Sequence, residues 1–263
     1  MAASERTGRT DFDPSVPHPA RVYNYWLGGK DNFAADRMAA EKDIKLLPEI
    51  VAGMRANREF LVRTVRYLAG QGIRQFLDVG TGLPAPNNTH EVAQAIAPES
   101  RVVYVDNDPM VVVHAEALLR SSLEGRCVYI DSDMRDADFI LKEASRTLDF
   151  SQPVALILHL VPDDAEAERI VTALAKRLAP GSYIAISHMT ADFAPEAVLA
   201  AAKAYNDMAP VPVTARNHAQ VSGLFGGRQL VEPGLVAVNR WPSDSGAGDP
   251  ETIVGVYGGI ARA

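Results

Sequence analysis

Residues 75–85 read Gln75-Phe-Leu-Asp-Val-Gly-Thr-Gly-Leu-Pro-Ala85, a short apolar strand that runs into a tight glycine turn. A second apolar strand over residues 101–105 follows after one helix-length segment and ends at Asp106. Strand, glycine turn, helix, strand and acid form the layout of a nucleoside-binding βαβ unit. In such a unit the glycines let the backbone approach a ligand, and the acid accepts both ribose hydroxyls. The segment therefore predicts the kind of cofactor better than it predicts the substrate.

Strand-like and helix-like segments alternate along the rest of the chain, which is typical of a parallel, doubly wound sheet. After the first strand we expect strands over residues 101–105, 127–130, 154–158 and 182–187. The tail predicts two more, residues 229–231 extended by 235–238, and residues 252–260, which close the sheet as a hairpin. Helices are expected over residues 33–45, 49–69, 90–96, 110–121, 165–178 and 194–208, and from a cap at Thr214 to about Phe225.

Composition is that of an ordinary globular protein. The 263 residues suit one large domain, or one domain with a lid, and 47% of them are hydrophobic. The formal net charge of -7 argues against a general surface for polyanions, so nucleic acid is not an expected partner. No segment approaches the ~18 apolar residues of a membrane span. The polar start lacks the apolar core of a signal peptide, so we expect a cytoplasmic protein with no membrane partner.

The N-terminal region divides into a tail and a cap. Residues 1–17 are polar and predict a disordered tail, and residues 18–72 predict a helical lid ahead of the main domain at residues 73–263. In Tyr23-Asn-Tyr-Trp-Leu-Gly-Gly-Lys-Asp31, aromatic residues precede two adjacent glycines that break a continuous helix. These aromatic residues either pack on the core or belong to a lid over a pocket, and the sequence leaves both interpretations open.

The glycine turn also satisfies the dinucleotide pattern G-x-G-x-x-[G/A], so NAD(P) has to be weighed against S-adenosylmethionine. A pyrophosphate needs free backbone N–H groups at the start of the helix after the turn. Pro84 and Pro86 remove two such donors and restrict their neighbours. Because S-adenosylmethionine has no phosphate and needs only the glycine turn and a diol acceptor, the prolines favour it as the cofactor.

Several segments carry a family resemblance. They are His18-Pro-Ala-Arg-Val-Tyr-Asn-Tyr-Trp-Leu-Gly-Gly-Lys-Asp-Asn-Phe33, Arg55-Ala-Asn-Arg58, Asp78-Val-Gly-Thr-Gly-Leu-Pro84, Val105-Asp-Asn-Asp-Pro109 and Val231-Glu-Pro-Gly-Leu235. Together they resemble an actinobacterial family of S-adenosylmethionine-dependent methyltransferases, long described as a domain of unknown function. The resemblance implies the α/β, Rossmann-like class I methyltransferase fold, with seven mostly parallel strands in the order 3-2-1-4-5-7-6 and the seventh antiparallel. It implies no particular substrate.

The resemblance also implies cofactor-binding residues. Class I methyltransferases place an acid after the third strand on the adenine amino group, and Asp133-Met134 fits this pattern; the alternative is that Asp133 is an ordinary loop acid. A more distant similarity to leucine carboxyl methyltransferase-like enzymes implies that Arg58, or failing it Arg55, binds the cofactor's carboxylate. The residues expected to bind the cofactor are Arg58, Asp78, Gly80, Thr81, Gly82, Asp106, Asn107, Asp133, Met134 and His159.

The acceptor side is less well defined by the sequence. His159 and His188 end the fourth and fifth strands, whose carboxyl ends face the ligand crevice, so either is a candidate general base, although a histidine at a strand end is more often structural. Tyr23 and Tyr25, in the aromatic segment, could both position an acceptor, and Tyr25 is the third candidate catalytic residue. No grouping of His, Asp and Glu has metal-ligand spacing, so we expect no metal.

Three functions remain open at this point. The sequence favours a methyltransferase that acts on a small molecule. The first alternative is an NAD(P)-dependent oxidoreductase, and the second is a non-catalytic regulatory protein that binds S-adenosylmethionine. An open acceptor cavity beside the cofactor would favour the enzyme over the regulator. The sequence does not distinguish a monomer from a homodimer.

Overall fold

Seven strands form a single sheet in the computed structural model of the chain, which describes residues 13–111, 121–159, 166–241 and 254–263. The strands are β1 (Gln75–Val79), β2 (Arg101–Asp106), β3 (Arg126–Asp131), β4 (Ala155–His159), β5 (Tyr183–Met189), β6 (Val236–Ala237) and β7 (Val256–Arg262). Their order is β3-β2-β1-β4-β5-β7-β6, and β7 runs antiparallel to both β5 and β6. The expected strand order and the antiparallel seventh strand are confirmed.

Helices cover both faces of the sheet. They are α1 (Pro19–Trp26), α2 (Ala34–Leu46), α3 (Ile50–Gly70), α4 (Thr89–Ile96), α6 (Ala137–Ala144), α7 (Ala167–Ala175), α8 (Pro195–Asn206) and α9 (His218–Gly223), with a 3-10 turn η1 (Val238–Arg240). Side chains of each strand alternate between the two faces. In β1, Leu77 and Val79 join the apolar cluster of α6 and α7, whereas Phe76 joins the cluster of α3 and α4. The alternation therefore produces a three-layer fold with two cores.

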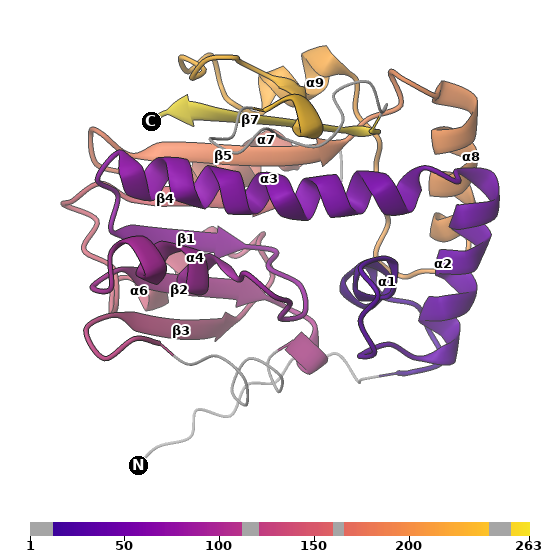
Figure 1. Ribbon diagram of the computed structural model, residues 1–263, viewed down its shortest axis with the longest axis horizontal. Helices are drawn as coiled ribbons and strands as arrows, with labels where there is room; N and C mark the ends of the chain where they lie inside the picture. The colour runs from indigo at the N-terminus through magenta and orange to yellow at the C-terminus, as the bar shows by residue number, and fades with distance from the viewer. Residues whose placement is uncertain (1–12, 112–120, 160–165, 242–253) are drawn as a thin grey trace.

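The helices before β1 occupy two different positions (Figure 1). The long helix α3 runs across one face of the sheet, and its Phe60, Val65 and Leu68 belong to the sheet's own core. By contrast, α1 and α2 stand with α8 beyond the carboxyl ends of the parallel strands. Of the expected cap at residues 18–72, α1 and α2 are thus the part that adjoins the edge where a ligand is expected.

Some expected elements fall partly outside the described residues. Residues 1–12 of the expected tail lie there, whereas Pro17 is described and buried. The expected helix over residues 110–121, the start of the helix over 165–178 and the start of the last strand also fall there, at least in part. In the described ranges, no helix is long and apolar enough to cross a lipid bilayer.

Three expectations about local structure were wrong. Helix α6 was not expected; it begins after Asp136, whose side chain accepts a hydrogen bond from the Phe139 N–H. The helix expected from Thr214 begins instead after Asn217, because Asn217 and Gln220 form a reciprocal capping box. The strand expected over residues 229–231 and 235–238 is shorter in both parts: a single bridge at Leu230 and β6, on either side of a turn over residues 231–234.

Gly258 lets α3 and η1 pack directly on β7. A Cβ at this position would lie 2.8 Å from the Phe60 ring and 2.8 Å from a Val238 methyl group. We expect Gly258→Ala to lower the free energy of unfolding by about 1–3 kcal/mol, because these buried side chains have to move. Chemical denaturation followed by circular dichroism measures the change.

Gly53→Ala is the matched control, because its Cβ would meet only the Gly255 nitrogen, at 3.8 Å. That substitution lies within α3 and should leave stability unchanged or raise it by up to ~1 kcal/mol through helix propensity. Equal effects of the two substitutions would show that close packing at Gly258 does not contribute to stability.

Candidate active site

A cavity of about 290 Å³ lies where the carboxyl ends of the parallel strands meet the outer helices. Its sheet side is formed by residues at or just after the carboxyl ends of β1, β2, β3 and β4, among them Gly80, Thr81, Gly82, Asp106, Asn107, Asp133, Met134 and His159. Its helical side is formed by α1, α2, α3, α8 and the loop over residues 210–214. The cavity thus brings most of the expected cofactor-binding residues together and joins them to a second, mostly apolar half.

The glycine turn after β1 is held against β2. The Gly80 N–H donates to the Val105 carbonyl at 2.8 Å, and the Thr81 N–H donates to the same carbonyl at 3.3 Å. Gly80 and Gly82 have φ angles of 76° and 66°, a region that favours glycine. A Cβ on Gly82 would meet no atom within 4 Å. The turn is therefore fixed in place and leaves open space for a ligand beside its backbone.

Asp106 lies at the end of β2, buried beside this turn. Its Oδ2 accepts a hydrogen bond from the Gly82 N–H at 2.7 Å, and its Oδ1 accepts from Asn107 and Asp108 N–H groups at 2.9 and 3.1 Å. Burial raises the pKa of Asp106, although the backbone donors oppose the shift. A carboxylate offers about four acceptor positions, two on each oxygen. The backbone donors already occupy both positions on Oδ1 and one on Oδ2. A ribose diol that binds here therefore has to share Oδ2 with the Gly82 N–H or displace it.

Asp133 and Met134 lie where β3 ends. The Asp133 carboxylate accepts from the Arg135 backbone at 2.9 Å and from the Arg135 guanidinium at 3.1 Å, and 38% of its side chain is exposed. The Asn107 amide lies 3.5 Å from it. Met134 packs against the apolar cluster behind the sheet, and its methyl group would lie 3.3 Å from a Cβ on Gly80. Acid and thioether therefore border the same end of the cavity.

Arg58 and Asp78 place opposite charges next to the glycine turn. Nη2 of Arg58 donates to the carbonyls of Ala85 and Pro86 and to Oδ1 of Asn88, whereas its buried Nε has no partner among the described residues. Asp78 accepts from the Thr89 hydroxyl through Oδ2 at 2.6 Å, and its buried Oδ1 likewise lacks a described partner. Burial raises the pKa of Asp78 to about 6. Arg58 lines the main cavity, whereas Asp78 does not and lines a smaller pocket that shares Arg58, Thr81 and Gly82 with it.

Arg55, the alternative to Arg58, is exposed and does not line the cavity. It lies three residues before Arg58, near the same face of α3, but only Arg58 is partly buried and reaches the cavity. The geometry thus favours Arg58 of the two arginines.

The two histidines expected at the site differ in what their rings contact. Nδ1 of His159 lies 2.7 Å from the Ser187 hydroxyl, and its buried Nε2 has no partner among the described residues. Burial, and secondarily Arg58, lowers the pKa of His159 to about 4, so the ring is neutral near pH 7. His188 Nδ1 donates to the Met189 carbonyl, so its Nε2 carries the lone pair, and that lone pair faces the guanidinium of Arg216. Of the two rings, His159 is the one with a free nitrogen at the cavity.

The structure does not bring Tyr25 to the cavity. Its hydroxyl contacts the carboxylate of Glu41, and it is not among the lining residues. Tyr23, two positions earlier on α1, lines the cavity instead; its hydroxyl donates to the Met54 carbonyl at 3.0 Å and accepts from the Asn57 amide at 3.3 Å. Burial raises the pKa of Tyr23 to about 12.

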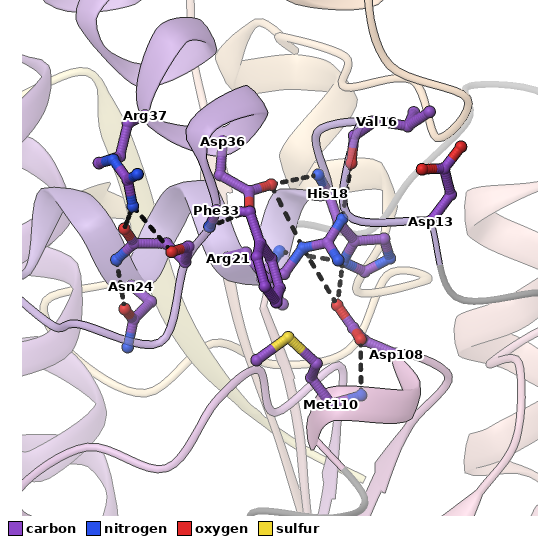
Figure 2. A network of polar contacts seen from close by, with 12 residues as sticks. Asp13, Val16, His18, Arg21, Asn24, Phe33, Asp36, Arg37, Asp108 and Met110 are labelled. Carbon is purple, nitrogen blue, oxygen red and sulfur yellow. Dashed lines mark hydrogen bonds and ion pairs between the residues drawn. The ribbon is translucent and has the colours of Figure 1, made fainter.

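A buried polar network fixes the start of α1 (Figure 2). Oδ1 of Asp36, on α2, accepts from the His18 backbone at 3.0 Å and from Nε of Arg21 at 3.2 Å. Nδ1 of His18 lies 2.9 Å from Oδ2 of Asp108, two residues after Asp106. Burial alone would raise the pKa of Asp108, but His18 and a backbone donor outweigh it and lower the pKa. Helix α1 is thus connected both to α2 and to the segment that directly follows Asp106.

Sequence reasoning missed three polar residues of the helical half: Asp43, Asn57 and Tyr205. For Asp43, helical periodicity was the available signal. The buried positions of α2 form one continuous stripe of Ala35, Asp36, Ala39, Ala40 and Asp43. Two acids on a buried stripe could have been noticed. Among the described residues, no group of three or more His, Cys, Asp and Glu side chains could hold a metal ion.

Comparison with known proteins agrees with this geometry. A family model described as S-adenosyl methyltransferase matches residues 5–263. The chain is 44% identical to a DUF574 family protein from Streptomyces avermitilis, and the two structures superpose with a TM-score of 0.90 over 95% of this chain and 98% of that one. It is 39% identical to a candidate methyltransferase from Thermobifida fusca, with a TM-score of 0.86 over 96% of each chain. A search of curated proteins finds no match. The chain therefore belongs to the S-adenosyl methyltransferase family, and its cofactor is S-adenosylmethionine.

Proposed function

We propose that the protein transfers the methyl group of S-adenosylmethionine to a small, largely apolar acceptor that binds in the helical half of the cavity. The observation that carries this proposal is the continuity of the cavity, from the glycine turn and strand ends to an apolar wall on α1, α3 and α8. A regulator that only senses the cofactor has no need of this second half. Family membership favours the methyltransferase over the oxidoreductase.

In this proposal, the residues around the sheet edge hold the cofactor by its three polar parts. Asp106 accepts from the ribose hydroxyls, and Asp133 accepts from the adenine amino group while Met134 packs on the ring. Arg58 donates through Nε to the carboxylate, and Asp78 accepts through Oδ1 from the ammonium. Gly80, Thr81 and Gly82 leave room for the ligand along their backbone, and Asn107 borders the ribose. The unpartnered Arg58 and Asp78 atoms support these roles because they have opposite charge, as the two ends of an amino acid do.

Bound S-adenosylmethionine supplies a methyl carbon on a sulfonium that is already activated for displacement. The protein's part is therefore to align the acceptor, to exclude water and to take up a proton where the acceptor releases one. His159 is placed for the last task, since its Nε2 faces the cavity without a described partner. Its pKa of about 4 makes it a weak base near neutral pH. We assign it the role of a hydrogen-bond partner that orients a hydroxyl acceptor and receives its proton as the methyl bond forms.

Asp106→Ala tests the cofactor half. The substitution removes charge-assisted hydrogen bonds worth ~1.5–3 kcal/mol, so affinity for S-adenosylmethionine and S-adenosylhomocysteine should fall ten- to a hundredfold. Isothermal titration calorimetry measures both affinities, with NADPH as a ligand that should not bind. Asp131→Ala is the matched control, because Asp131 pairs with Asp106 in the β2–β3 register but is exposed and outside the cavity. Unchanged affinity in Asp106→Ala would remove Asp106 from the site.

Methyl transfer itself is tested by incubation of the protein with S-adenosylmethionine and a panel of apolar hydroxyl- and amine-bearing compounds. Formation of S-adenosylhomocysteine, followed by chromatography, should depend on the acceptor and be lost in Asp106→Ala. Tight cofactor binding without turnover across the panel would favour the regulatory function instead.

The ionisation of His159 gives a further prediction. Because burial disfavours the charged ring, the His159 signal in NMR spectra of histidine-labelled protein should keep its neutral shift down to about pH 5 and move only near pH 4. An ordinary histidine titrates near ~6.5. His159→Asn assigns the signal by its disappearance. Titration near 6.5 would show that the ring is solvated and is not placed as described.

A further inference from the structure

The helical half of the cavity contains three buried polar side chains, each with an atom that lacks a partner among the described residues. They are Asp43 on α2, Asn57 on α3 and Tyr205 on α8, each 3% exposed, and the free atoms are Oδ1 of Asp43, Oδ1 of Asn57 and the Tyr205 hydroxyl. All three residues line the same cavity. Buried polar groups are normally hydrogen-bonded, so each exception needs an explanation. Three exceptions from three helices around one cavity indicate a ligand.

Asp36 is a second buried carboxylate on α2, and it has a structural role because all its hydrogen-bond partners belong to the protein. Two turns before Asp43 on the same buried stripe, it accepts hydrogen bonds from His18, Arg21 and Phe33. Asp43 has no such donors in the described structure. Burial raises the pKa of its carboxyl to about 7, opposed by Lys42 on the exposed side of the same helix. The facing titratable group is Tyr205, whose pKa is raised first by burial and then by Asp36 and Asp43.

The three atoms without partners determine whether the ligand has to donate or to accept hydrogen bonds. Asn57 donates through its amide nitrogen to Tyr23, whose own hydroxyl proton goes to the Met54 carbonyl, so the atom left over is an acceptor oxygen. Asp43 Oδ1 is also an acceptor when ionised, and the Tyr205 hydroxyl can accept or donate. A group with several donors and a positive charge matches this set, because charge-assisted hydrogen bonds are the strongest that a buried carboxylate can make.

We propose that the acceptor carries a protonated amine on an apolar body, and that Asp43 binds this amine with Asn57 and Tyr205 around it. The proposal rests on the proposed function, since it names the class of molecule that the helical half takes. A protonated amine has no lone pair, so it is not the atom that receives the methyl group. Asp43 lies on α2, which with α8 stands farther from the strand ends than α1 does (Figure 1), and this leaves the methyl-receiving atom nearer to His159 at the sheet edge. Asp43 is thus a specificity-determining binding residue.

A matched series of probes tests the charge preference. 2-Phenylethylamine and 4-phenylbutylamine are compared with the alcohols and carboxylates of the same chain length, on protein saturated with S-adenosylhomocysteine, by calorimetry or ligand-observed NMR. Each amine should bind at least tenfold more tightly than its alcohol, and the carboxylates should bind more weakly than either. Asp43→Asn should remove at least tenfold of the amine's affinity and leave that of the alcohol unchanged. Equal affinity for amine and alcohol in the wild type would overturn the proposal.

Glu41→Gln is the control, because it removes a carboxylate from an exposed position of the same helix that does not line the cavity. It should leave amine affinity unchanged; an equal loss in both variants would show a general charge effect and contradict the proposal. Affinity for S-adenosylhomocysteine should be the same in all variants. If the wild type fails to bind that ligand, the proposed function fails, whereas the amine series on the protein alone still decides the role of Asp43.

Thermal stability gives an independent readout that also separates binding from a structural role. Without ligand, Asp43→Asn should raise Tm, because it removes a buried carboxylate that lacks a partner. The folded-state pKa of about 7 lies above the ~3.9 of an unfolded aspartate, so the ionisable carboxyl lowers wild-type stability progressively as pH rises from about 4 to about 7. The Tm difference should therefore grow across this window and stay constant above it. A lower Tm in Asp43→Asn at neutral pH would show that the carboxylate supports the fold and would overturn the proposal.

Discussion

The hydrogen bonds between the glycine turn and the end of β2 are the constraint on which the rest of the site depends. Gly80 donates to Val105 and Gly82 to Asp106, which aligns the turn and the acid along one edge of the sheet. Two residues further on, Asp108 contacts His18 and thereby fixes the start of α1. Residues 106–108 thus position both the glycine turn and helix α1, which border the two proposed halves of the cavity. A change in the conformation of residues 106–108 would therefore alter the proposed binding sites of both the cofactor and the acceptor.

Much of the fold was predictable because it depends on local patterns. Apolar runs such as residues 154–158 identified strands that are buried on both faces, and the family resemblance supplied their order. The errors arose where several local signals compete. Thr214 and Asn217 are both acceptable caps, and only the reciprocal partner Gln220 decides between them. Helix α6 is short and follows an acidic loop, so its apolar period is brief.

The cofactor half of the site was easier to predict than the acceptor half. Strand ends of a parallel sheet converge on one edge, so Asp106 could be placed there from the strand that it ends, and the family resemblance added Asp133. The acceptor half is built by helices from distant parts of the chain, and Asp43 and Tyr205 meet only through the packing of α2 on α8. Secondary-structure patterns do not encode that packing. For the same reason the sequence pattern did not distinguish Tyr23 from Tyr25, and the direction of α1 places only Tyr23 at the cavity.

Arg58 joins two functions in one side chain. One guanidinium nitrogen holds the loop over residues 85–88 through Ala85, Pro86 and Asn88, and the buried Nε, which has no partner among the described residues, is the atom that we propose for the cofactor's carboxylate. The geometry of that loop and the grip on the cofactor are therefore energetically linked. Changes at Asn88 and Arg58 should combine non-additively. In a diverging lineage, the two positions would be constrained to change as a pair, even though only Arg58 is proposed to contact the cofactor.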